Sequence, residues 1–142
     1  MKHRTDEDNR QMLGLAHASL YHWGVVGSPR ERAVGEWQVS RVYSAMGQGA
    51  LALLYAKSCL ETCERNHLSD ITHTASEAVA RAYAVAGEFE KATRQVEKAR
   101  TQLGKLTLSS EDRKIYTNQL RDTQALIRKL STNAAENAAT PK

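Results

Sequence analysis

The feature that most constrains the fold of this chain is an internal repeat with an offset of 40 residues. The segment RVYSAMGQ at 41–48 aligns with RAYAVAGE at 81–88, so that Arg, Tyr and Gly recur at matched positions. Small or apolar residues match further along, in the pairs Ala52 and Ala92, Ala56 and Val96, and Cys59 and Ala99. A period of this size is typical of solenoids, in which pairs of helices stack on their neighbours. The repeat therefore predicts a stacked helical array rather than a closed bundle.

Nearly all of the chain has the apolar spacing of α-helices. The clearest stripe, with alternating steps of three and four residues, consists of Phe89, Ala92, Val96, Ala99, Leu103 and Leu106. Ser28, Pro29 and Glu31 have the order of a capped helix start, and glycines stand where helices are expected to end. We expect an all-α fold of about six antiparallel helices, each of roughly 15–20 residues, joined by short turns.

The domain organisation follows from the same patterns. The 142 residues fit one domain, which we place at residues 1–130. The last predicted helix, 110–130, is polar on most of its surface, as expected of the helix that caps a repeat array. Residues 131–142, with the sequence STNAAENAATPK, have no apolar stripe, and we expect them to form a disordered tail.

The spacing within each repeat resembles the tetratricopeptide repeat, in which a Tyr precedes a turn Gly by four residues and small residues follow at fixed intervals. The matching positions are Tyr83, Gly87, Ala92, Val96 and Ala99 in one unit, and Tyr43, Gly47, Ala52, Ala56 and Cys59 in the other. The resemblance covers residues 33 to about 106, with units at 33–66 and 73–106. It implies a right-handed superhelical array whose concave surface binds a peptide or partner protein, as an adaptor or scaffold does.

Four residues are the candidate partner-binding site. Arg41 and Arg81 occupy matching places in the two repeats, and Trp37 and Glu77 each precede them by four residues. The resemblance implies that such positions line the concave groove. There the two arginines would hold a partner's carboxylate, and Trp37 would supply an aromatic anchor. Two structural alternatives stay open: Glu77 and Arg81 form a surface ion pair on one helix, or Trp37 packs on Arg41 or in the core.

The distribution of charge supports an alternative function. The net charge of +4 divides into −2 over residues 1–90, with nine basic and eleven acidic residues, and +6 over residues 91–142, with eleven and five. The basic helices at 91–129 would bind nucleic acid or an acidic partner. Only Tyr116 is aromatic in this region, whereas single-stranded nucleic acid is usually bound by several stacking rings. We therefore expect a protein or peptide partner, and consider nucleic acid the weaker choice.

No arrangement of residues predicts catalysis, and we expect a protein that is not an enzyme and has no cofactor. Cys59, Cys63 and His67 are spaced to share one side of a helix, which suits zinc or a reactive thiol. A structural zinc site usually takes four ligands, and Cys59 also occupies a packing position of the repeat. Core packing is the simpler interpretation, so we predict no metal site and no catalytic residue.

The composition also bears on location and assembly. The first ten residues are charged throughout, no stretch of about 18 apolar residues occurs, and there are only two cysteines. These features predict a cytoplasmic protein without a membrane segment. A homo-oligomer also fits, because a two-repeat array has open ends and a second copy would cover an apolar end.

Overall fold

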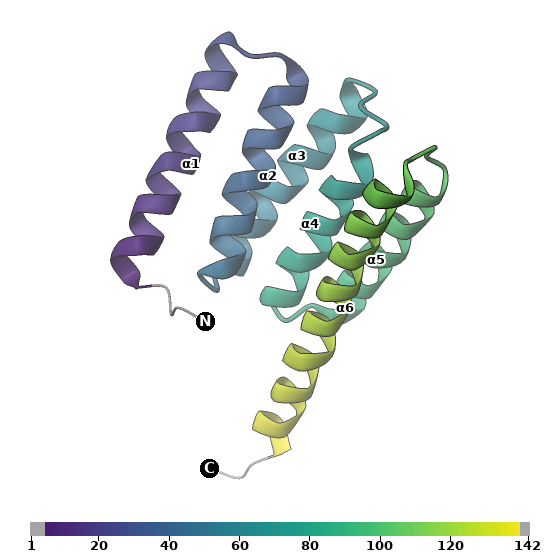
Figure 1. Cartoon of the computed structure of the whole chain (residues 1–142). Coiled ribbons are helices and arrows are strands. Elements are labelled where there is room, and N and C mark those ends of the chain that lie inside the picture. The colour runs from purple at the N-terminus through teal and green to yellow at the C-terminus, as the bar shows by residue number, and fades with distance from the viewer. Residues whose placement is uncertain (1–4, 140–142) are drawn as a thin grey trace.

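The computed structural model describes residues 5–139, and within this range the chain forms six α-helices and no strand. The helices are α1 (Asp6–Val26), α2 (Pro29–Ala45), α3 (Gly49–Arg65), α4 (Thr72–Val85), α5 (Phe89–Gly104) and α6 (Ser110–Ala139). Consecutive helices run antiparallel, so the start of α1 and the end of α6 lie toward the same end of the helix layer (Figure 1). The predicted all-helical fold and the number of helices are confirmed for this range.

Local sequence explains where the first two helices begin. Thr5 caps α1 and Ser28 caps α2, each accepting a hydrogen bond from the backbone N–H three residues later. The carboxylate of the acidic residue at that third position accepts a hydrogen bond from the backbone N–H of the cap residue, which completes a capping box in both cases. Pro29 occupies the first turn of α2, where its missing N–H costs nothing.

The repeated Tyr and Gly form the same helix ending twice. At the end of α2, the Gln48 N–H donates to the carbonyl oxygen of Tyr43 at 2.9 Å, and Gly47 has a φ of 75°. At the end of α4, the Glu88 N–H donates to Tyr83 at 2.9 Å, and Gly87 has a φ of 83°. This left-handed conformation is the one in which glycine has no steric penalty. The Tyr and Gly that recur at the 40-residue offset therefore form the end of α2 in one segment and the end of α4 in the other.

The matched small residues form the contacts between helices. The six small or apolar residues that match at the 40-residue offset are all buried, namely Ala52, Ala56, Cys59, Ala92, Val96 and Ala99. The start of α3 and the end of α4 approach closely, because a side chain at Gly49 would come within 2.7 Å of the backbone of Ala86. Gly49 thus opens α3 rather than ending α2, and its lack of a side chain lets α4 pack against this turn.

The last helix is longer than the sequence predicts. Helix α6 continues to Ala139, so the expected disordered tail from residue 131 is wrong for residues 131–139. The reason is local: this segment contains four alanines before residue 140, and alanine is the strongest helix former. Residues 132–139 are exposed and project from the array (Figure 1). The rest of the predicted tail, 140–142, lies outside the described residues.

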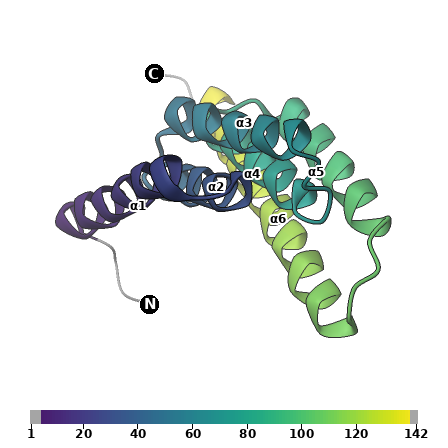
Figure 2. The ribbon, with the colours of Figure 1, turned by 90° about the horizontal axis from the view of Figure 1, so that it is seen from above.

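Helices α2, α4 and α6 form one continuous row, because α2 packs on α4 and α4 packs on α6. Helices α3 and α5 pack behind this row, and α1 lies at its edge, far from α6 (Figure 2). Between residues 5 and 139, no helix combines the length and hydrophobicity needed to cross a membrane. The row of α2, α4 and α6 presents the face on which the candidate site lies.

Candidate functional site

The structure brings the four predicted site residues together. Trp37 and Arg41 lie one turn apart on α2, and Glu77 and Arg81 lie one turn apart on the neighbouring α4. The guanidinium carbon of Arg41 is 5.0 Å from the centre of the Trp37 ring, and both arginines form ion pairs with Glu77. The positions that match at the 40-residue offset therefore lie side by side on neighbouring helices.

Glu77 is the centre of this cluster, and it is buried rather than exposed. Its residue exposure is 2%. Its Oε2 accepts a hydrogen bond from the Thr123 hydroxyl at 2.9 Å and lies 3.0 Å from Nη2 of Arg81. The same nitrogen of Arg81 donates to Thr123 at 3.2 Å, which closes a triangle between α4 and α6. The surface ion pair considered above is thus a buried one.

The two arginines differ in what they leave available. The Arg81 side chain is 14% exposed, and its contacts with Glu77 and Thr123 commit it to the fold. The Arg41 side chain is 38% exposed, and its Nη1 lies 3.7 Å from Oε1 of Glu77, too far for a hydrogen bond. Burial lowers the pKa of Arg41, and the charge of Arg81 lowers it further. Arg41 therefore keeps donors for another molecule, whereas Arg81 holds the carboxylate beside it.

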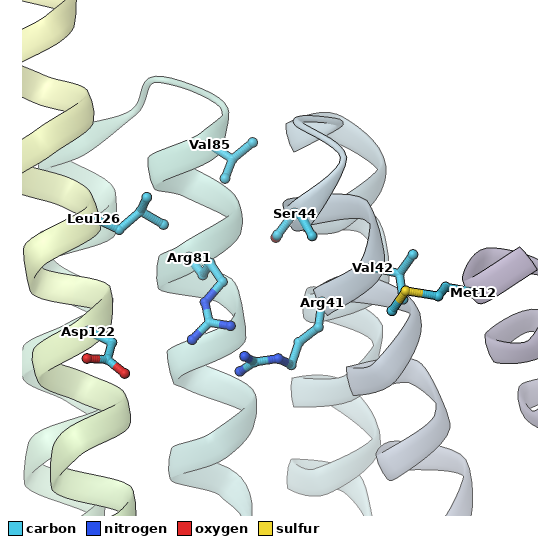
Figure 3. A pocket seen from close by; sticks show the side chains of 9 residues that line it. Met12, Arg41, Val42, Ser44, Arg81, Val85, Asp122 and Leu126 are labelled. Carbon is cyan, nitrogen blue, oxygen red and sulfur yellow. The ribbon is translucent and has the colours of Figure 1, made fainter. Parts of the chain in front are cut away.

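A pocket of about 600 Å³ opens over the two arginines. Figure 3 shows the Arg41 guanidinium extending from α2 toward that of Arg81 on α4, with Asp122 of α6 on one side and Met12 of α1 on the far side. Val42, Val85 and Leu126 add apolar surface to its wall. The pocket thus joins an exposed cation to an apolar lining and spans four helices.

Sequence reasoning missed the contribution of the last helix to this site. Thr123 and Asp122 reach the cluster from α6, which was expected only to cap the array. One signal was present: Thr123 is a polar residue on the otherwise apolar stripe of Leu120 and Ile127, and all three are buried. A polar residue on a buried stripe needs a polar partner, which here is Glu77.

A second, apolar pocket of about 230 Å³ lies on the other side of Trp37. Its lining comes from α2, α3, α4 and α6, and includes Trp37, Cys59, Cys63, Ile71 and Tyr116. The indole N–H of Trp37 is buried and has no hydrogen-bond partner among the described residues. Trp37 thus packs against Arg41 on one face and lines this pocket between helices. The two alternatives considered for it, packing on Arg41 and packing in the core, therefore both apply.

The cysteine and histidine candidates do not form one cluster. Cys59 and Cys63 are free and buried, and the Cys59 thiol lies 3.2 Å from the carbonyl oxygen of Ala33. Hydrogen bonding between the two thiols raises the pKa of Cys59 and lowers that of Cys63. His67 is exposed beyond the end of α3, where it has a φ of 55°. Across residues 5–139, no group of three or more His, Cys, Asp or Glu side chains could hold a metal ion.

Comparison of the chain with protein-family models, with curated proteins and with solved structures finds no match. The function is therefore inferred from the residues and geometry described above.

Proposed function

We propose that this chain is a non-enzymatic, cytoplasmic interaction module that binds a peptide or partner protein on the face of α2, α4 and α6. In this proposal the helix pairs α2–α3 and α4–α5 are tetratricopeptide-like units of a right-handed superhelical array, and α6 is its cap. Support for the repeats comes from the two identical helix endings at Gly47 and Gly87 and from the matched small residues between helices. The face of α2, α4 and α6 is then the concave, binding surface.

The observation that carries the proposal is the position of Arg41. Its guanidinium is partly exposed in the 600 Å³ pocket, packs over Trp37, and has no hydrogen bond with any described side chain. An arginine held in this way is already ordered, so less side-chain entropy is lost when it binds. Buried arginine and tryptophan side chains are also the residues that most often dominate the energy of protein interfaces.

The chemistry of the site defines the partner's contact group. Glu77 neutralises Arg81, and Asp122 adds a second carboxylate on the α6 side of the pocket. Among the described residues, Arg41 is therefore the pocket cation whose hydrogen-bond donors are unused, rather than half of a double clamp. A carboxylate of the partner would accept charge-assisted hydrogen bonds from Arg41, and an adjacent apolar side chain would contact Val85 and Leu126. The expected partner segment is therefore acidic and apolar within a few residues.

The test is Arg41→Gln in affinity capture from the protein's own host, read by quantitative mass spectrometry. Loss of a charge-assisted hydrogen bond costs about 1.5–3 kcal/mol, so the dissociation constant of a specific partner should rise about tenfold or more. Arg81 is unsuitable, because replacing it would leave Glu77 buried without its closest cation.

Arg65→Gln is the matched control, since Arg65 is an exposed arginine of α3, outside both the row of α2, α4 and α6 and the basic helices at 91–129. The control should capture the same proteins as the natural chain, in the same amounts. The proposed site is wrong if Arg41→Gln, with an unchanged thermal melt, captures those proteins as well as Arg65→Gln does.

A second candidate function is binding of nucleic acid or an acidic partner by the basic helices at 91–129. Its specific observation is a pocket of about 330 Å³ between α5 and α6, lined by Arg100, Arg113 and Arg121. Arg113 is committed to the carbonyl oxygens of Leu103 and Leu106, and Arg100 pairs with Glu97. Of the three arginines that line this pocket, Arg121 alone has no hydrogen bond or ion pair within the described range. This makes the site a weaker candidate than the one at Arg41.

Electrophoretic mobility shift of DNA and RNA tests the second candidate. Binding through these arginines predicts an affinity that falls linearly with salt on logarithmic axes, and a smaller slope for Arg121→Gln. The absence of any shift at low salt removes nucleic acid from consideration.

A further inference from the structure

Helix α1 lies at an open end of the array. It packs mainly against α2 and reaches α3 through the ring contact of His17 with Tyr55, whereas α2 is packed between α1, α3 and α4. Ala16 is its one buried residue, and Leu13 and Leu20 face the same neighbour as partly buried side chains. Figures 1 and 2 show α1 at the edge, with no helix beyond it. One whole side of this 21-residue helix is therefore exposed.

Beyond Arg10, the exposed side of α1 is largely apolar and carries no charge, because the charged residues of this helix, Asp6, Glu7, Asp8 and Arg10, all lie in its first five positions. Residues 11–29 contain no Asp, Glu, Lys or Arg, although a quarter of the chain's residues are charged. Leu15 is 73% exposed, Tyr21 is 77% exposed and Val25 is 67% exposed. Single exposed apolar residues are ordinary, but a continuous uncharged helix face of this length is typical of an interaction surface.

The opposite end of the array has a different surface. The exposed residues of α6 include Glu111, Asp112, Lys114, Arg121 and Arg128. If copies stacked head to tail, the apolar face of α1 would bury these charges without partners, at a large cost in free energy. Contact between the two α1 helices of two copies buries no charge. It also closes after one step, as a two-fold dimer does.

We propose that two copies of this chain associate through the exposed face of α1, with the two helices antiparallel about a two-fold axis. The proposal is independent of the partner site at Arg41. The second copy is favoured over other occupants because a two-fold contact places the residues of this face against the same residues of the other copy. A net charge on the face would then be repelled by the equal charge on the other copy, whereas an uncharged face meets no such repulsion.

The spacing of the exposed residues fixes the register of the two helices. Gln11, Leu15, Ala18, His22 and Val25 are all exposed and alternate steps of four and three residues, which is the spacing of a helix-pairing seam. Ala18 is the midpoint of this seam, so the two-fold axis passes beside it. Leu15 of one copy then packs near Tyr21 and His22 of the other, and the small side chain of Ala18 lets the helices approach.

The first experiment measures the mass of the purified full chain by sedimentation velocity over a range of concentrations. The expected result is a reversible monomer–dimer equilibrium that persists in high salt, because apolar contacts are not screened. Leu15→Glu introduces two carboxylates into the contact, one from each copy, and should raise the dissociation constant about a hundredfold. Leu54→Glu is the matched control: Leu54 is 61% exposed on α3, outside the proposed contact, and its replacement should leave the equilibrium unchanged.

The second experiment tests the register by disulfide formation. Ala18→Cys should yield a covalent dimer under mild oxidation, because the two-fold axis brings the two thiols together. Ala125→Cys on α6 is the control, since Ala125 is equally an exposed helical alanine and lies far from the contact. It should form no covalent dimer under the same conditions, although the reversible association through α1 remains, and the natural cysteines Cys59 and Cys63 are buried.

Three results would overturn the proposal. One is a chain that stays monomeric at every concentration, and another is equal loss of the dimer in Leu15→Glu and Leu54→Glu. The third is a monomer that floats with vesicles of neutral phosphatidylcholine in a Leu15-dependent way, which would assign the face of α1 to a lipid surface instead.

Discussion

Glu77 shows how one buried side chain links a structural role to the candidate site. It is 2% exposed, and it holds Arg81 and Thr123 while lying beside Arg41. Glu77→Ala should lower the free energy of unfolding by about 3–5 kcal/mol, because Arg81 would keep a buried charge without its partner. Urea unfolding followed by circular dichroism measures this change.

A second Glu–Arg pair in the chain provides the control for Glu77. Glu61 and Arg65 on α3 have the same spacing of four residues, but their side chains are 65% and 72% exposed. Glu61→Ala should cost less than about 0.5 kcal/mol, since exposed pairs are solvated and screened. If Glu77→Ala and Glu61→Ala have equal effects, burial of the Glu77 pair contributes nothing to stability.

At the scale of the helices, the sequence predicted what depends on local chemistry. The capping box at Ser28 and the glycine ending at Gly87 involve residues within five positions of each other, so their geometry can be inferred from the sequence alone. The extension of α6 to Ala139 was missed, because an apolar stripe was required of every helix. An alanine-rich segment that continues an existing helix needs no such stripe, since its nucleus is already formed.

The candidate site could be predicted only for residues that the 40-residue offset relates to one another, because the offset indicates which positions lie close in space. Matching positions in stacked repeats are neighbours, so Arg41, Glu77 and Arg81 could be placed together from their 40-residue offset. Thr123 lies outside the repeat and is 46 residues from Glu77, and no spacing rule connects them. The burial of Glu77 follows from that contact with α6, which is why a surface ion pair was an equally good interpretation of the sequence.

At the scale of the whole molecule, the array should open from its N-terminal end. Helix α4 contacts α2, α3, α5 and α6, and most of its residues are buried, whereas α1 packs on α2 and reaches α3 through the ring contact of His17 with Tyr55. Because each of these helices is stabilised mainly by the helices it packs on, opening should start where such neighbours are missing. Hydrogen exchange read by mass spectrometry should find the slowest amides in α4 and much faster exchange in α1.

The Leu15→Glu variant separates this opening from self-association, because it removes the contact that would protect α1 in a dimer. In that variant, exchange in α1 should be fast at every protein concentration. In the natural chain, the exchange rate in α1 should fall as concentration rises, while α4 stays unchanged. Equal exchange rates in α1 and α4 of the variant would mean that the six helices open as a single cooperative unit. The smaller number of neighbours of α1 would then not lower its stability below that of α4, which contradicts the prediction.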